Sequence, residues 1–334
     1  MIRIVFMGTP EFAVPVLEKL SQTDKIEIVA VVTQPDRPRG RGKQLTFSPV
    51  KEKALALGLQ VLQPERVREE DFLKRLQELK PDLIIVAAFG QILPQEILTL
   101  PPHGCLNVHA SLLPAYRGAA PIQRAILQGE EKTGISIMLM EQGLDTGDVL
   151  AEEEVPIPFT MNYGELHDAL AIVGAELLAR TVPRWLAGLI EPVPQEKITE
   201  RKPGYASPLR RDDEIISWAN PAEMIYNQIR GLAPVPGAYT IFQGKPLKIR
   251  ESEPVNDDLA GLKDEQQPVV VHAPGTVVAL LKGKGFVVQT GSGCLLIKQV
   301  QLVGKNIIPA QSFLNGYHLE VGYVFNSIEE RTSK

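Results

Sequence analysis

An amide and an imidazole lie two residues apart in the stretch LNVHASLLP. In an extended strand residues i and i+2 point to the same side, so Asn107 and His109 share one face while Val108 points to the other. A loop follows at once, which places the pair at the carboxyl end of its strand, where open α/β sheets bind ligands. An Asn amide can donate a hydrogen bond to a developing oxyanion, and a His can move protons near neutral pH. The pair therefore suits acyl transfer to a nucleophile that the substrate supplies, such as an amine.

A third polar group is expected to orient the imidazole or to relay its proton. The segment GLDTGDVL offers Asp145, which Gly143 and Gly147 bracket in a tight turn. Asp148 is better explained as a turn residue that bonds its own backbone. Two alternatives need no such site: a buried Asn–His hydrogen bond that closes the strand end, or a serine hydrolase. The hydrolase is weak because no nucleophile-elbow pattern surrounds Ser111.

Apolar strands alternate with helical segments through the first 190 residues, which predicts an α/β, Rossmann-like, mostly parallel sheet covered on both faces. Thr9 and Ser48 are expected as N-caps, each followed by a proline, and Pro183 as a kink or break in a long helix. Strands are expected at 2–8, 26–33, 82–90, 104–110, 134–140 and, at one edge, 148–157; helices are expected at 10–20, 48–58, 69–80, 121–129 and 163–189.

The composition changes after this part. We expect a catalytic domain over 1–190, a Pro-rich, charged linker over 191–207, and a C-terminal domain over 208–334, where short strands with glycine turns suggest a small β-barrel. Residues 208–334 carry no net charge, so the net −5 of the chain lies in the first 207 residues. Two distant cysteines and no apolar run of membrane-spanning length suit a reducing cytoplasm and argue against a Cys-based metal site.

One basic segment stands out within the acidic part. The stretch DRPRGRGK places Arg37, Arg39, Arg41 and Lys43 at alternate positions, and its Pro and Gly residues prevent a helix. Alternating cations on an exposed loop suit a nucleic acid phosphate backbone. An ordinary solvated loop is the alternative on composition alone.

Several long strings together resemble the folate-dependent formyltransferases: MGTPEFAVPVL, TQPDRPRGRGKQL, FGQILP, LNVHASLLPAYRGAAPIQRAI and GLDTGDVL. The resemblance covers essentially the whole chain. It implies a formyltransferase fold followed by an OB-like β-barrel that contacts tRNA. It also implies that a formyl group passes from 10-formyltetrahydrofolate to the α-amine of methionine on an initiator tRNA.

The resemblance also implies roles for individual residues. Asn107, His109 and Asp145 match the catalytic trio, and Arg41 matches the best-placed arginine of a loop that engages the tRNA acceptor arm, together with Arg37, Arg39 and Lys43. The tetrahydrofolate loop matches Ser111, Leu112, Leu113 and Pro114, and the segment lining the pterin pocket includes Phe89, Gly90 and Ile92. Basic residues of the C-terminal part that could hold tRNA are Lys245, Lys248, Arg250, Lys282, Lys284 and Lys298.

Other functions stay open on the residues themselves. A nicotinamide-dependent oxidoreductase is disfavoured because MGTPEF has one glycine where the dinucleotide motif needs three, and Thr33 ends the second strand without an acid. A formyltransferase for glycinamide ribonucleotide or an amino sugar would share the trio but would not need the basic loop. A tRNA-binding module without catalysis is the third alternative. We expect a cytoplasmic monomer that uses neither metal nor NAD.

Overall fold

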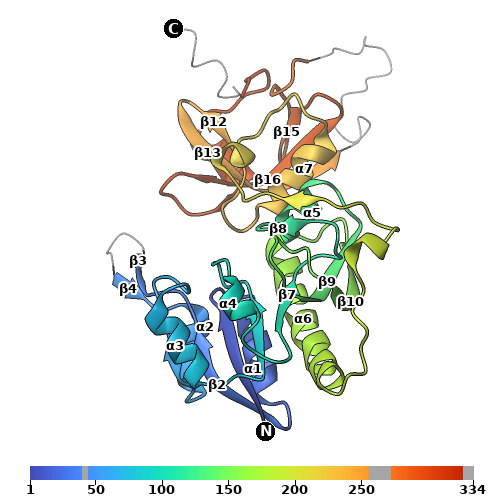
Figure 1. Ribbon diagram of the computed structural model, residues 1–334. Helices are drawn as coiled ribbons and strands as arrows, with labels where there is room; N and C mark the ends of the chain where they lie inside the picture. Colours follow the sequence, from blue (N-terminus) through green and yellow to red (C-terminus); the bar gives the residue numbers. More distant parts are fainter. Residues whose placement is uncertain (40–43, 256–271, 326–334) are drawn as a thin grey trace. The chain divides into compact units, whose positions relative to one another are not determined.

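The computed structural model describes residues 1–39, 44–255 and 272–325 (Figure 1). The chain forms two compact units, which we call the first and the second unit. The first comprises Met1–Ile122, Lys132–Pro156 and Leu166–Ser207, and the second comprises Gln123–Glu131, Ile157–Glu165 and Pro208–Lys334. Among the described residues, no helix combines the length and the apolar character that crossing a bilayer requires.

The described part of the first unit is built on a seven-stranded sheet. Its pairs are parallel from β7 to β5, whereas β9 and β10 add to the other edge antiparallel. The mostly parallel sheet and its returning edge strand were both expected and are confirmed. Across the sheet the strands are β10 (Val149–Pro156), β9 (Lys132–Leu139), β7 (Cys105–His109), β6 (Leu83–Ala87), β1 (Ile2–Gly8), β2 (Ile26–Val32) and β5 (Val61–Leu62).

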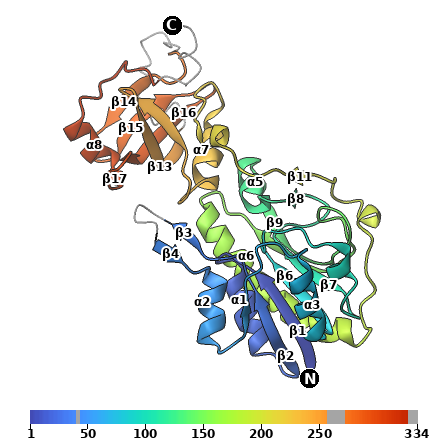
Figure 2. The same ribbon diagram turned by 60° about the vertical axis from the view of Figure 1, so that its left-hand side comes forward.

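Helices cover this sheet on both faces (Figure 2). On one face Phe72 and Ile97, from α3 and α4, pack into one core cluster with Val5 of β1. On the other face α6 passes so close to β7 that a Cβ at Gly174 would lie 2.9 Å from the Val108 side chain. The helices are α1 (Ala13–Ser21), α2 (Pro49–Ala56), α3 (Glu70–Glu78), α4 (Gln95–Leu98), α5 (Pro121–Leu127) and α6 (Tyr163–Leu186).

Of the three expected helix features, the Ser48 cap is confirmed, the Thr9 cap is wrong, and α6 is not broken at Pro183. Ser48 caps α2 as predicted, since its side chain accepts the amide of Lys51 at 3.0 Å. Thr9 does not cap α1, which begins at Ala13; its hydroxyl instead donates to the Phe89 carbonyl at 2.9 Å and ties two loops together. Pro183 neither breaks nor ends α6, which continues to Leu186. Val182 beside it is fully buried, so packing keeps this last turn helical despite the missing amide.

The segment 191–207, expected to be a linker, is folded onto the first unit. Its 3-10 helix η1 (Gln195–Lys197) begins with a side chain that is only 2% exposed. Further on, β11 (Tyr205–Ala206) pairs in parallel with β8 (Arg117–Gly118). Its Pro-rich, aperiodic sequence therefore marks a structured connection held by hydrogen bonds rather than by a repeating apolar pattern.

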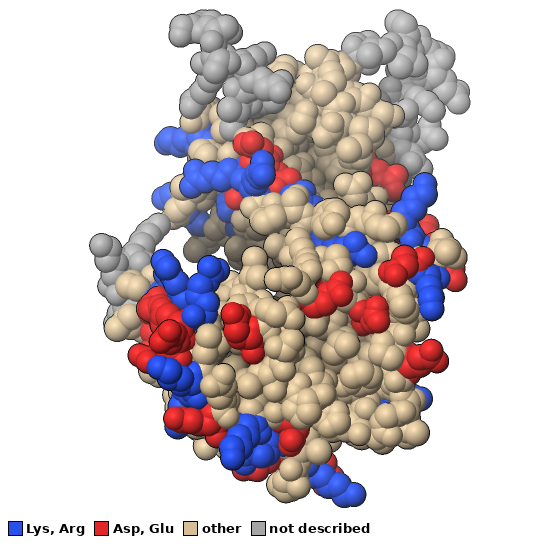
Figure 3. Space-filling model, viewed as in Figure 1, with Lys and Arg blue, Asp and Glu red and all other residues tan. Residues whose placement is uncertain are grey.

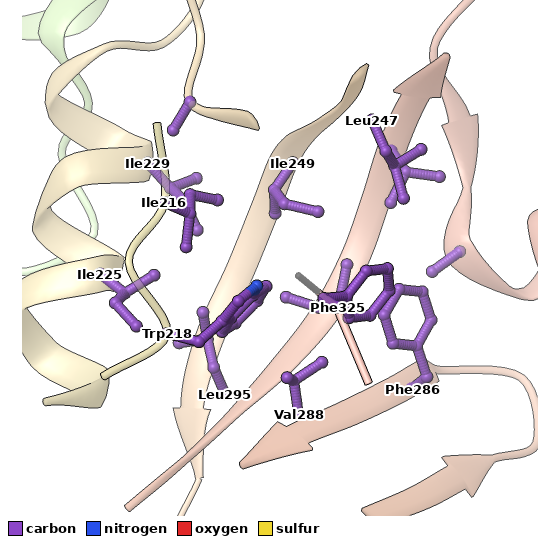
Figure 4. Close-up of a cluster of buried hydrophobic side chains, with 14 of the residues drawn as sticks. Ile216, Trp218, Ile225, Ile229, Leu247, Ile249, Phe286, Val288, Leu295 and Phe325 are labelled. Carbon is purple, nitrogen blue, oxygen red and sulfur yellow. The ribbon is translucent and has the colours of Figure 1, made fainter. Parts of the chain in front are cut away.

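The second unit is an antiparallel β domain, as expected for the C-terminal part. Its core packs Trp218, Phe286 and Phe325 with the aliphatic residues labelled in Figure 4, and Trp218 Nε1 donates to Thr240 Oγ1 at 3.0 Å. Helix α7 (Ala222–Gly231) supplies Ile225 and Ile229 to this core. The strands follow the order β12 (Tyr239–Phe242), β13 (Lys245–Val255), β16 (Cys294–Leu302), β15 (Gly285–Gln289) and β14 (Val277–Leu281); β17 (Ile308–Pro309) pairs with β16, and α8 (Ala310–Gly316) follows.

Two short segments that we expected in the N-terminal domain belong to the second unit. In 123–131, Arg124 forms an ion pair with Asp213 at 2.8 Å. In 157–165, Phe159 stacks on Tyr226 with ring centroids 4.7 Å apart. Neither segment has a composition that departs from its neighbours, so no local pattern indicates this exchange.

Candidate active site

Asn107 and His109 lie at the end of β7, on the side of the strand opposite to Val108 and helix α6. The register pairs Asn107 with Val86 of β6 and with Met138 of β9. His109 ends the strand and is buried, with 5% of its surface exposed. The predicted common face and position at the carboxyl end of the strand are therefore both found.

Asp145 reaches this strand end from the turn between β9 and β10. Its φ is +53°, in the left-handed region that Asp enters more readily than most residues. Both flanking positions have no room for a side chain. A Cβ at Gly147 would overlap the Leu139 carbonyl oxygen, and one at Gly143 would overlap the Thr146 hydroxyl. The tight turn inferred from GLDTG is thus present, and it directs the carboxylate toward β7.

The Asp145 carboxylate is the centre of the cluster. Its Oδ1 accepts from Asn107 Nδ2 at 3.4 Å, and its Oδ2 accepts the Gly118 amide at 2.8 Å. His109 Nδ1 lies 3.7 Å from Oδ2. The three residues expected to act together are therefore adjacent, and both polar side chains of β7 face the acid.

The imidazole of His109 is also held by a main-chain carbonyl. Its Nε2 lies 3.0 Å from the Tyr116 carbonyl oxygen. A carbonyl only accepts hydrogen bonds, so Nε2 carries a hydrogen and donates it. The other ring nitrogen, Nδ1, faces the carboxylate of Asp145.

The loop Ser111–Pro114 follows β7 directly and is firmly held. Ser111 Oγ donates to the Ala115 carbonyl at 2.6 Å. The buried hydroxyl of Ser136, on β9, donates to the Ser111 carbonyl at 2.8 Å and accepts the Leu113 amide at 3.0 Å. Ser111, Leu112 and Leu113 are buried, and the Ser111 carbonyl and the Leu113 amide are both engaged by Ser136, so the loop is fixed in one conformation.

The other expected ligand segment follows β6, the strand next to β7, so both loops leave the same edge of the sheet. Gly90 has a φ of +88° and is exposed. Ile92 is 84% exposed, whereas Phe89 is buried in the core beneath the sheet. Gly90 and Ile92 are therefore accessible, whereas the Phe89 carbonyl already accepts from Thr9 at 2.9 Å and from Gln34 at 3.3 Å, so the structure does not expose Phe89 to a ligand.

The basic segment forms a short hairpin of β3 (Arg37–Arg39) and β4 (Gln44–Thr46), where no regular structure was expected. Arg41 and Lys43 lie outside the described residues. Arg37 is 69% exposed and 3.9 Å from Glu65. At the base of the hairpin, hydrogen bonds from Lys51 (2.5 Å) and Gln63 (2.8 Å) hold the pKa of Asp36 below its ordinary value. The residue that precedes β3 is therefore fixed by two side chains.

Sequence reasoning missed four residues that build the cluster. Tyr116 and Gly118 supply a carbonyl and an amide, which no side-chain pattern reveals. Arg117 donates to Gln195 Oε1 through Nε at 3.0 Å and Nη2 at 2.7 Å. The Gly in AYRGAA was a usable signal, because Gly118 has a φ of +113°, whereas Gln195 was hidden in the presumed linker.

Two family models and full-length relatives match this chain. Residues 2–182 match the model of the family described as formyl transferase, and residues 208–318 match that of the formyl transferase C-terminal domain. The methionyl-tRNA formyltransferase of Bacillus subtilis (strain 168) is 49% identical over 99% of this chain and 100% of its own length. That of Symbiobacterium thermophilum is 50% identical over 98% of this chain and 97% of its own.

Solved structures share the fold at much lower identity. An N-formyltransferase from Helicobacter canadensis, in complex with folinic acid and dTDP-3-aminofucose, superposes with a TM-score of 0.62 at 18% identity, over 89% of this chain and 99% of that one. HypX from Aquifex aeolicus in complex with tetrahydrofolic acid gives 0.59 at 17% identity, over 98% of this chain and 51% of that one. With both domains matched and half of its residues shared with named enzymes along its entire length, the chain belongs to the formyl transferase family, among the methionyl-tRNA formyltransferases.

Proposed function

We propose that the protein transfers the formyl group of 10-formyltetrahydrofolate to the α-amino group of methionine on initiator tRNA, through Asn107, His109 and Asp145. The observation that carries this proposal is the convergence of an amide, an imidazole and a carboxylate at one strand end. The reaction forms a bond from the amine nitrogen to the formyl carbon and breaks the bond from that carbon to the folate nitrogen. The proton that the amine loses ends on the leaving nitrogen.

Asn107 is proposed to stabilise the charge that develops on the formyl oxygen. An amide nitrogen carries two hydrogens, and the contact with Asp145 at 3.4 Å uses one of them. That contact orients the amide, so the second hydrogen is held in a defined direction for the substrate. A neutral donor that is already oriented needs no rearrangement as charge builds up.

His109 is proposed to move the proton through Nδ1. Its Nε2 is committed to the Tyr116 carbonyl, so the ring cannot turn without losing that bond. Asp145 Oδ2, 3.7 Å from Nδ1, stabilises the imidazolium that forms when the amine gives up its proton. A carboxylate that is itself held by the Gly118 amide keeps this distance short.

The loops after β6 and β7 are proposed to hold the folate. The support is that Ser136 holds Ser111–Pro114 in one conformation after β7, while Gly90 and Ile92 after the neighbouring strand β6 are exposed. When bound, the folate supplies the activated formyl group. The structures of relatives in complex with folinic acid and tetrahydrofolic acid support a folate site on this fold.

The β3–β4 hairpin, with Arg37, Arg39, Arg41 and Lys43, is proposed to contact the phosphate backbone of the tRNA. The support is an arm that carries alternating cations on an anchored base. We expect Arg41→Ala to raise the KM for tRNA more than the KM for the folate, because a phosphate contact is made to the tRNA alone. Equal increases in both constants would contradict this assignment.

The second unit is proposed to add a non-specific electrostatic grip on the tRNA. Lys298 lies 2.7 Å from Glu253, and Arg250 bonds Gln301, so these two cations are engaged within the unit. Lys245, Lys282 and Lys284 lie at hairpin turns and are exposed, which makes them the better candidates. Figure 3 shows Lys and Arg atoms in blue among Asp and Glu atoms in red on the face in view.

The experiment that tests the proposed function follows labelled formyl from 10-formyltetrahydrofolate to methionyl-initiator tRNA. Methionyl-elongator tRNA, glycinamide ribonucleotide and an amino sugar serve as alternative acceptors. We expect transfer to the initiator tRNA alone at an appreciable rate. Faster transfer to either small acceptor, or equal use of the two tRNAs, would overturn the proposal. A cytoplasmic location is also proposed, because the two cysteines are free and buried, which suits a reducing compartment. The protein is further proposed to be a monomer, for which light scattering should give a mass near 36.7 kDa.

A further inference from the structure

Gln195 joins the turn that carries Asp145 to strand β8. Its Nε2 donates to the Asp145 carbonyl at 2.9 Å and to the Gly147 carbonyl at 2.7 Å. Its Oε1 accepts hydrogen bonds from Arg117 Nε at 3.0 Å and from Arg117 Nη2 at 2.7 Å. An amide has two N–H donors and two acceptor lone pairs, so every hydrogen-bonding capacity of this buried side chain is used. Such complete satisfaction makes the side chain a fixed link rather than an adaptable one.

The turn that Gln195 holds needs support. A non-glycine residue in the left-handed region persists only where its surroundings impose it. Asp145 is in that region at φ +53°. The two hydrogen bonds from Gln195 go to the carbonyls of Asp145 and Gly147, so they oppose relaxation of the turn.

The side chain of Asp145 is held by Gly118, the residue after Arg117. The Gly118 amide donates to Asp145 Oδ2 at 2.8 Å. Strand β8 therefore holds both parts of Asp145: the carboxylate directly through Gly118, and the main chain through Arg117 and Gln195. The segment with Gln195 is itself fixed to the first unit, since Arg201 bonds Glu152 at 2.6 Å and β11 pairs with β8.

We propose that Gln195 is a positioning residue for formyl transfer, which sets the place of the Asp145 carboxylate relative to Asn107 and His109. This inference rests on the role proposed above for Asp145. It predicts that loosening Gln195 acts on the chemical step and leaves substrate binding nearly unchanged, because Gln195 acts through Asp145 and is buried.

The test compares Gln195→Glu with Gln195→Met in the full-length protein. Gln195→Glu keeps the size of the side chain and its contact with Arg117 but has no N–H for the two carbonyls. Gln195→Met removes both halves at similar volume. A misplacement of about 1 Å can cost on the order of 100-fold, so we expect kcat to fall about 10- to 100-fold in both. The KM for the folate and for the tRNA should change less than about twofold.

Two further measurements separate positioning from simple destabilisation. Hydrogen exchange of the Gly118 amide should become faster in both variants, because its acceptor moves. Glu196→Gln, a change at the exposed neighbouring residue, is the matched control and should keep wild-type kcat and exchange. If Gln195→Glu does not fold, Gln195→Met carries the same comparison.

The outcomes distinguish this inference from the proposed function. Wild-type kcat in the Gln195 variants, an increase in KM alone, or a lower kcat with unchanged Gly118 exchange would each overturn the positioning role. Asp145→Ala is measured in parallel. If it keeps wild-type turnover, the proposed role of Asp145 fails; if it loses turnover while the Gln195 variants do not, only the positioning role fails.

Discussion

The variants Asn107→Ala and Asn107→Asp test whether Asn107 acts as a hydrogen-bond donor or only fills space in the site. The alanine variant removes the donor and leaves Asp145 and His109 in place. Loss of one oxyanion donor typically costs about 100- to 1000-fold in rate, or about 2.7–4 kcal/mol. We expect a loss of that size, with little change in the KM for either substrate.

The aspartate variant is closer in shape to Asn107 but should be worse. It places a carboxylate oxygen where Nδ2 now lies, 3.4 Å from Asp145 Oδ1. At an effective dielectric constant of about 20, two like charges at that separation repel by about 5 kcal/mol. At pH 8 we therefore expect Asn107→Asp to be slower than Asn107→Ala. Relative to Asn107→Ala at the same pH, it should recover as the pH falls and the pair of acids takes up a proton.

The assay is single-turnover transfer of labelled formyl with both substrates saturating, between pH 5.5 and pH 8.5, as a rough working range for proteins. The control is Asn162→Ala, which removes another amide. Asn162 Oδ1 accepts the Glu165 amide at 3.1 Å at the start of α6, so its loss should cost about 1 kcal/mol of stability and no transfer rate. Asn107→Asp that is as fast as Asn107→Ala at pH 8 would refute this reasoning, as would a loss below about threefold in Asn107→Ala.

Three other predictions follow from buried or crowded groups. Gly147→Ala should lower both kcat and the melting temperature, because its Cβ would overlap a main-chain carbonyl; unchanged values would show that the turn adapts. Burial raises the pKa of Cys105 to about 12, and Cys294 is buried too, so iodoacetamide at pH 8 should label neither until denaturant is added; rapid labelling of the folded protein would contradict this. The hydrogen bond from Arg124 lowers the pKa of Asp213, so this pair adds stability above the unfolded-state pKa of about 3.9 and loses it as the pH falls through the lower folded-state pKa. The difference in free energy of unfolding between wild type and Arg124→Gln should therefore shrink below about pH 4; a constant difference would exclude the pair as its source.

The arrangement of the sheet and the cluster of Asn107, His109 and Asp145 could be predicted because local patterns determine them. Apolar strands alternating with helices require a covered parallel sheet, and the two-residue spacing of Asn107 and His109 places both on one face. The two glycines around Asp145 predicted a tight turn. Each of these inferences depends on residues close together in the sequence.

What could not be predicted depends on contacts between distant segments. Thr9 has the sequence of an N-cap, but its hydroxyl is taken by the Phe89 carbonyl, 80 residues away. Pro183 stays within α6 because its neighbours are buried, which a single sequence does not show. Gln195 looked like part of a linker because its partners are the Arg117 side chain, 78 residues away, and two main-chain carbonyls of the Asp145 turn, which no local pattern reveals.

The most direct test of the account is whether Asn107 and Asp145 act as one unit. The single-turnover rate of formyl transfer is measured for Asn107→Ala, Asp145→Asn and the double variant. Side chains that function together are not additive, so the double variant should be within about tenfold of the slower single variant. A loss in the double variant equal to the product of the two single losses would mean that the residues act independently, and would contradict the cluster as the site of the chemistry.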